Sequence, residues 1–69
     1  MTDEIPKAPL DRLLRKAGAD RVSDKAASAL ADILYEYSIE LGVQAKILAN
    51  HAGRKTVTAE DVKLAARAV

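Results

Sequence analysis

The feature that most constrains the fold of this chain is the stretch from Ser23 to Ala52, which contains no proline and only one glycine, Gly42. Without helix breakers, this stretch predicts one helix of about 28 residues, roughly 42 Å long. A compact domain of 69 residues has a radius of gyration of about 11 Å and spans roughly 28 Å. The expected helix is therefore longer than a compact domain built from one copy of the chain.

Apolar side chains line one face of this helix along its whole length. The two short helices expected on either side, residues 9–17 and 59–68, span only about 15 Å each and cannot cover that face. We therefore expect an obligate homodimer in which two long helices pair. Six residues fall within about 40° of Leu41 around the helix: Leu30, Leu34, Tyr37, Ala45, Leu48 and Ala52.

The core available to one chain is small. About half of the residues are apolar, but 14 of these are alanine, and Phe, Trp and Cys are absent. A disulfide therefore cannot stabilise the chain, and burial against a partner is the remaining route. Each short helix adds an apolar face at the i, i+3, i+4, i+7 spacing: Leu10, Leu13, Leu14 and Ala17 in the first, and Val62, Ala65, Ala66 and Val69 in the third.

The connectors between the helices repeat one pattern. Gly18 and Gly53 follow the ends of helices, where glycine adopts the left-handed conformation without a steric penalty. Ser23 and Thr58 then stand where a hydroxyl can cap the next helix. Asp61, three residues after Thr58, predicts a short-armed capping box. The chain thus reads as helix, connector, helix, connector, helix.

Positive charge concentrates around these connectors, although the net charge is only +1. Residues 10–25 carry a net +2 and residues 46–56 a net +3, whereas residues 26–45 carry −3. Such a field favours binding of a polyanion. The alternative is that the connectors are simply solvated polar loops.

Several classes of function are excluded. With one histidine, His51, and no cysteine, we expect no metal site, no cofactor and no enzymatic activity on a small-molecule substrate. The chain lacks an apolar run long enough to span a membrane, and its N-terminus lacks the features of a signal peptide. We therefore expect a cytoplasmic protein.

Residues 17–23 (AGADRVS) and 51–62 (HAGRKTVTAEDV), which flank the long helix, resemble those of archaeal-type histones. The resemblance covers about Pro6 to Ala68. It implies an all-α histone fold in a single domain, residues 1–69, with a flexible N-terminus over residues 1–7. It also implies a handshake dimer in which the first connector of one subunit lies beside the second connector of the other.

A histone of this type would bind, bend and wrap double-stranded DNA with little sequence preference, in association with the chromosome. The resemblance implies that Arg21 enters the minor groove and that Lys55 and Thr56 meet phosphates. Arg12 would contact phosphate from the first helix. Six residues thus form the expected DNA-binding set: Arg12, Arg15, Lys16, Arg21, Lys55 and Thr56.

Further roles follow from the same resemblance. Arg54 and Asp61 would form an intrachain ion pair that holds the second connector. Gly18 would be the small residue that lets successive turns of a protein–DNA superhelix approach closely. Four residues would join one dimer to the next and so permit polymerisation along DNA: Leu48, His51, Asp61 and Leu64.

The main alternative is a histone-fold subunit of a transcription or chromatin complex that acts through heterodimerisation. The low net charge and the apolar pair Ile39 and Val43, on the otherwise polar face of the long helix, favour this alternative. Arg21 and the complete set of dimer-joining residues favour the DNA-packaging histone.

Overall fold

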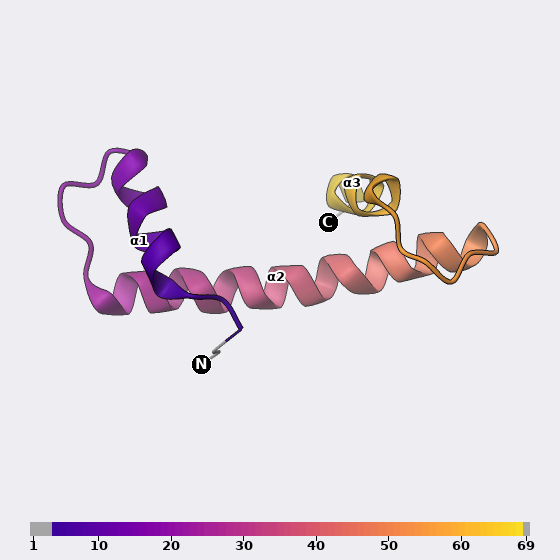
Figure 1. Cartoon of the computed structure of the whole chain (residues 1–69), viewed down its shortest axis with the longest axis horizontal. Helices are drawn as coiled ribbons and strands as arrows, with labels where there is room; N and C mark the ends of the chain where they lie inside the picture. Colours follow the sequence, from indigo (N-terminus) through magenta and orange to yellow (C-terminus); the bar gives the residue numbers. More distant parts are fainter. Residues whose placement is uncertain (1–3, 69) are drawn as a thin grey trace. The chain divides into compact units, whose positions relative to one another are not determined.

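The computed structural model describes residues 4–68, which form three α-helices and no β-strand. These are α1 (Lys7–Lys16), α2 (Asp24–His51) and α3 (Ala59–Ala68) (Figure 1). The all-α class and the 28-residue length of the central helix confirm the sequence predictions. Within the described residues, no helix combines the length and the apolar character needed to cross a membrane.

The start of α1 differs from the expectation. The helix begins at Lys7 rather than Pro9, so Pro9 is its third residue, and Lys7, the last residue of the expected flexible N-terminus, is its first. Proline is tolerated there because the N–H groups of the first turn have no acceptor within the helix. Residues 1–3 of the expected flexible segment, and Val69 of the third apolar face, lie outside the described residues.

Both helices that precede a connector end in the same way. Gly18 and Gly53 have φ angles of 112° and 73°, the left-handed region that favours glycine. After α1, the Ala19 N–H donates to the Leu14 carbonyl at 3.1 Å. After α2, the Arg54 N–H donates to the Ala49 carbonyl at 2.9 Å. These are Schellman caps, and they turn the chain sharply into each connector.

The chain divides into two compact units, one up to Glu36 and one from Tyr37. In the first, α1 lies beside the N-terminal part of α2 (Figure 1). The hydroxyl of Ser23 accepts a hydrogen bond from the Ala26 N–H at 3.0 Å, which confirms the predicted cap of α2. The buried apolar residues of this unit are Leu10, Ala27 and Ala31.

In the second unit, α3 crosses the C-terminal part of α2 and is seen nearly end-on in Figure 1. Its buried apolar residues are three alanines: Ala45, Ala49 and Ala65. Alanine contacts allow the two helices to approach closely, but they remove little apolar area from water. The core of this unit is therefore as thin as the composition predicts.

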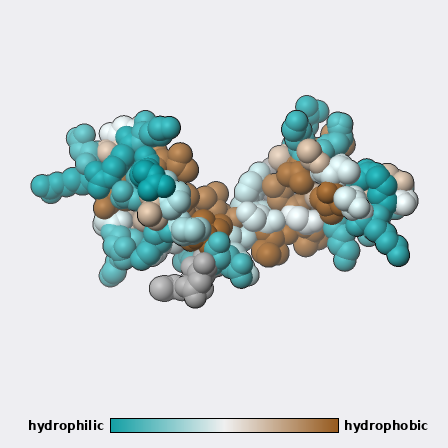
Figure 2. Space-filling view, in the orientation of Figure 1, coloured by the Kyte–Doolittle hydropathy of each residue, from teal (hydrophilic) through white to brown (hydrophobic). Residues whose placement is uncertain are grey.

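Large apolar side chains remain exposed in both units, and none of the described large side chains is fully buried. Figure 2 shows this hydrophobic surface in brown beside hydrophilic side chains in teal. Leu13 of the expected α1 face is 55% exposed, and Val62 of the expected α3 face is 41% exposed. One chain thus leaves part of its predicted apolar faces uncovered, together with large apolar side chains outside those faces. The exposed residues are Leu13, Ile33, Tyr37, Ile39, Val43, Ile47, Val57, Val62 and Leu64.

Candidate nucleic-acid interface

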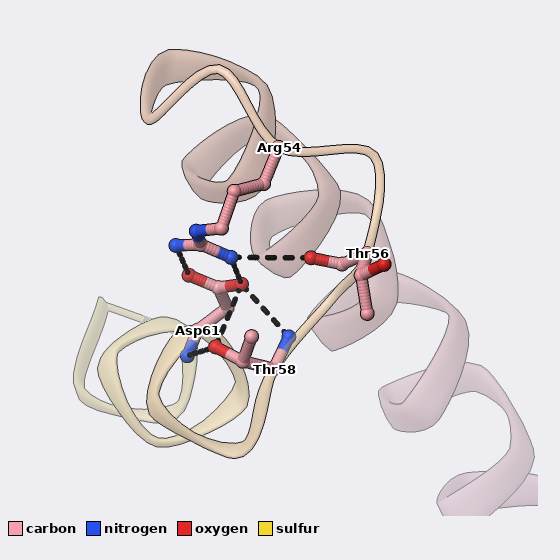
Figure 3. Close-up of polar contacts among 4 residues, drawn as sticks. All are labelled: Arg54, Thr56, Thr58 and Asp61. Carbon is pink, nitrogen blue, oxygen red and sulfur yellow. Dashed lines mark hydrogen bonds and ion pairs between the residues drawn. The ribbon is translucent and has the colours of Figure 1, made fainter.

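The second connector, residues 52–58, is closed by a reciprocal cap at the start of α3 (Figure 3). The Asp61 N–H donates to the Thr58 hydroxyl at 3.3 Å, and the Thr58 N–H donates to the Asp61 carboxylate at 2.9 Å. The Thr58 hydroxyl also donates to that carboxylate at 3.0 Å. This is the predicted capping box, with the shorter side chain of aspartate in place of glutamate.

Arg54 binds the same carboxylate through two nitrogens. Its Nη1 lies 2.7 Å from Asp61 Oδ2 and its Nη2 lies 2.9 Å from Oδ1. Nη1 also donates to the backbone carbonyl of Thr56 at 3.1 Å. A bidentate arginine–carboxylate pair is stronger and more directional than a single charged contact. The second connector is therefore clamped to the first turn of α3 (Figure 3).

Asp61 is the one charged or polar residue that the described chain buries, with 2% of its surface exposed. Hydrogen bonding to Arg54 lowers the pKa of Asp61, and the Thr58 N–H adds to the effect. The same bond raises the pKa of Arg54. Both groups stay charged at neutral pH. Because its guanidinium binds Asp61 and the Thr56 carbonyl, Arg54 has little freedom to contact a ligand.

The first connector, residues 17–23, is bound by Arg15 of α1. Arg15 Nε donates to Asp11 Oδ2 at 3.0 Å, and Arg15 Nη1 donates to the Asp20 carbonyl at 3.3 Å. The pair with Asp11 spans one helical turn, with the acid on the N-terminal side, which is the favourable order. Arg15, which belongs to the expected DNA-binding set, is thus already engaged within its own unit.

The other expected DNA contacts are exposed. Arg12 and Lys16 lie on α1 and Arg21 lies in the first connector, whereas Lys55 and Thr56 lie in the second. Within residues 4–68, the four basic side chains form no ion pair or hydrogen bond. Each unit therefore presents cations that can bind an external anion, beside a connector that other residues hold in shape.

The residues expected to join dimers all belong to the second unit. His51 and Leu64 are exposed, and Leu48 is half-buried. Asp61 differs, because its carboxylate is buried and occupied by Arg54 and Thr58. Its substitution would disturb the connector as well as any contact between dimers.

Three contacts were missed by the sequence analysis. The Lys7 ammonium lies 3.0 Å from Asp24 Oδ1, so an exposed ion pair joins the starts of α1 and α2. No spacing rule predicts it, because the two residues are 17 positions apart. The bond between Arg15 and Asp11 has the i, i+4 spacing and was detectable. The bond from Arg15 to the Asp20 carbonyl was not, since it depends on the path of the connector.

Comparisons with known proteins agree with this geometry. The family model described as histone-like transcription factor (CBF/NF-Y) and archaeal histone matches residues 3–66. One of the subunits of archaeal histone HAN1 from Thermococcus zilligii is 65% identical over 65 residues, which cover 94% of this chain and 97% of that protein. Probable archaeal histone 3 of Methanocaldococcus jannaschii is 50% identical over 64 residues, which cover 93% of this chain and 96% of that protein. The chain belongs to the family of histone-like transcription factors and archaeal histones, and is therefore a DNA-binding histone-fold protein rather than an enzyme.

Proposed function

We propose that this protein packages double-stranded DNA as a homodimer, bending the duplex through contacts to its backbone and minor groove. The observation that carries the proposal is the pairing of a braced connector with unengaged cations in each unit. Arg21 enters the minor groove, and Lys55 and Thr56 bind phosphates. Such contacts do not read base edges, so the binding is tolerant of sequence. A protein with this function is associated with the chromosome.

The uncovered apolar surface supports the homodimer. Ile33, Tyr37 and Ile47 of α2 are 62%, 39% and 44% exposed in one chain. Burying apolar surface stabilises by about 25 cal/mol per Å², and the thin core of each unit leaves that stabilisation to a partner. A second copy offers the same surface, which a two-fold arrangement can pair with itself.

Polymerisation along DNA is the next level of the proposal. Leu48, His51 and Leu64 form the contact between dimers, with Asp61 holding the adjacent connector. Gly18 has no heavy atom within 4 Å of the position that a Cβ would occupy, so its surface is open to close approach by a neighbouring turn of the protein–DNA superhelix. Repeated contacts of this kind would wrap the duplex along a chain of dimers.

The salt dependence of DNA affinity tests the function. The logarithm of the association constant for a duplex of mixed sequence should fall steeply with the logarithm of salt concentration, by about 0.9 per phosphate neutralised. Lys55→Ala should reduce that slope by roughly 1 for each chain without creating a sequence preference. Lys63→Ala on α3 is the matched control, because it removes the same charge outside the expected contact set. A wild-type affinity that does not change with salt would contradict the proposal.

A second candidate is a heterodimeric assembly. The relative from T. zilligii is named as one of the subunits of a histone, and Ile39 and Val43 are 56% and 50% exposed on α2. If heterodimerisation is required, the purified chain alone would remain monomeric and poorly folded at micromolar concentration. The homodimer instead predicts a mass of two chains in sedimentation equilibrium and a melting temperature that rises with protein concentration.

A further inference from the structure

Each connector is braced by an arginine in the same way. Arg15 joins a helix carboxylate, that of Asp11, to the connector carbonyl of Asp20. Arg54 joins a helix carboxylate, that of Asp61, to the connector carbonyl of Thr56. The first brace is the more exposed, with 52% of the Arg15 side chain and 35% of the Asp11 side chain open to solvent.

The acceptor of the first brace is part of the peptide group that leads into Arg21. A peptide group is planar, so its carbonyl oxygen and the Cα of the next residue lie in one plane. A hydrogen bond that orients the Asp20 carbonyl therefore orients the bond into the Arg21 Cα. Arg21 itself forms no hydrogen bond or ion pair within residues 4–68, so the backbone alone sets the point from which its side chain extends.

We propose that Arg15 is a positioning residue that works through Asp11 and the Asp20 carbonyl, and that it holds the first connector in the conformation that presents Arg21 to DNA. This inference rests on the proposed function, since Arg21 has that task only if the protein binds DNA. Asp11 contributes to this positioning although it is acidic, because its carboxylate holds the Arg15 guanidinium against the connector. A preorganised contact binds more tightly, since less freedom is lost on binding.

Removing the Asp11 carboxylate distinguishes a positioning role from a purely electrostatic one, because the two roles predict opposite changes in DNA affinity. Asp11→Ala deletes a negative charge near the proposed DNA surface, so a purely electrostatic role predicts tighter binding. The positioning role predicts weaker binding, by about twofold for each connector and so roughly fourfold for a dimer, the effect expected of one helical ion pair. Asp20→Ala is the matched control, because the Asp20 side chain lies outside the brace, and it should bind DNA more tightly than wild type. Tighter binding by Asp11→Ala would overturn the proposal.

Substitution of Arg15 separates positioning from a direct phosphate contact. Arg15→Lys keeps the charge but cannot offer two nitrogens in the planar arrangement that meets both acceptors. It should lose affinity by the same roughly fourfold factor with an unchanged salt slope, whereas Arg67→Lys on α3 should have no effect. A salt slope reduced by about 1 for each chain in Arg15→Gln, as a lost phosphate contact requires, would overturn the proposal.

Amide exchange in the DNA-free homodimer reports on the brace without using DNA. In Arg15→Lys and Asp11→Ala, the Ala19 amide, which donates to the Leu14 carbonyl where α1 runs into the first connector, should exchange several-fold faster, while the Arg54 amide at the matching position of the second connector stays at its wild-type rate. Unchanged exchange at Ala19 would show that no brace exists, even if DNA binding is confirmed. If wild-type DNA binding is insensitive to salt, the proposed function fails whatever the exchange data show.

Discussion

The Thr58 hydroxyl both accepts a hydrogen bond from the Asp61 N–H and donates one to the Asp61 carboxylate. Because that carboxylate also binds Arg54, one hydroxyl couples the N-terminus of α3 to the ion pair of the second connector. Loss of the Thr58 hydroxyl should therefore weaken both the cap of α3 and the ion pair between Arg54 and Asp61. In the first connector the two functions are separate, since Ser23 caps α2 and Arg15 binds Asp11.

This coupling predicts unequal costs for the two caps. Ser23→Ala should lower the free energy of unfolding by about 1 kcal/mol for each chain, the usual effect of a lost N-cap. Thr58→Ala should cost about 2 kcal/mol, at the upper end of that range, because it also removes a donor from a buried carboxylate. Urea denaturation at one fixed protein concentration measures both values. Thr58→Ser, which keeps the hydroxyl, should recover most of the loss, and equal costs would contradict the coupling.

The ion pair predicts an acid-sensitive contribution to stability. The pKa of Asp61 in the folded chain lies below its ordinary value of 3.8, chiefly because of the bond to Arg54. The stabilisation is therefore complete above that ordinary value and is lost as pH falls toward the folded pKa. The melting temperature of Asp61→Asn should lie below that of wild type at neutral pH, and the difference should shrink as pH falls below that ordinary value. Glu60→Gln is the control for lost charge in the same turn, and a difference that does not vary with pH would contradict this assignment.

Replacing Gly53 and replacing Gly42 by alanine should change the stability of the fold in opposite directions. Gly53→Ala places a side chain on a residue with φ of 73°, which should cost about 1 kcal/mol. Gly42→Ala lies within α2, where no heavy atom of the chain comes within 4 Å of the new Cβ, and should stabilise by up to about 1 kcal/mol. Thermal unfolding of both variants at matched concentration tests the pair. Destabilisation by Gly42→Ala would instead reveal a partner helix packed closely at that position.

Polymerisation along DNA can be separated from dimer formation. Leu48→Glu should leave dimers intact but abolish the ladder of protected lengths in nuclease digestion, because a charge at an apolar contact between dimers is not tolerated. Ile39→Glu, also on α2 but outside the dimer-joining set, should retain the ladder. Asp61→Ala is not a clean test, since Asp61 also holds Arg54 and Thr58. A ladder unchanged in Leu48→Glu would remove Leu48 from the contact.

Local rules predicted much of the fold because its helix ends depend on neighbouring residues. Gly53, Ser23 and the pair Thr58 and Asp61 act within a few positions of one another, and the structure contains the caps that their spacing predicts. The start of α1 was predicted two residues too late, because proline suits any position in the first turn. The presence of Pro9 alone could not show which position of the first turn it occupies.

The candidate site was harder to predict. The expected cations Arg21 and Lys55 are exposed in the structure. On α1, however, Arg12, Arg15 and Lys16 were placed together in the expected DNA-binding set by the sequence analysis. Arg12 and Lys16 remain unengaged within residues 4–68, whereas Arg15 is bound to a carboxylate and a carbonyl. The ion pair with Asp11 has the i, i+4 spacing. The bond to the Asp20 carbonyl depends on where the connector passes, which no periodicity encodes. The apolar face of α2 was visible in the sequence, but which of its residues one chain would leave exposed was not.

The sequence by itself determined the three helices and their caps, because these follow from periodicity and helix breakers, and its connector motifs indicated the family. It also predicts a partner, because an alanine-rich core of this size is thin. Only the tertiary structure decided which charges are committed within the chain and which are open to a ligand. Asp61 and Arg54 face each other across the turn into α3, and Arg15 reaches the carbonyl of Asp20. Such contacts are set by the direction of the backbone between helices, so they appear only when the connectors have a defined path.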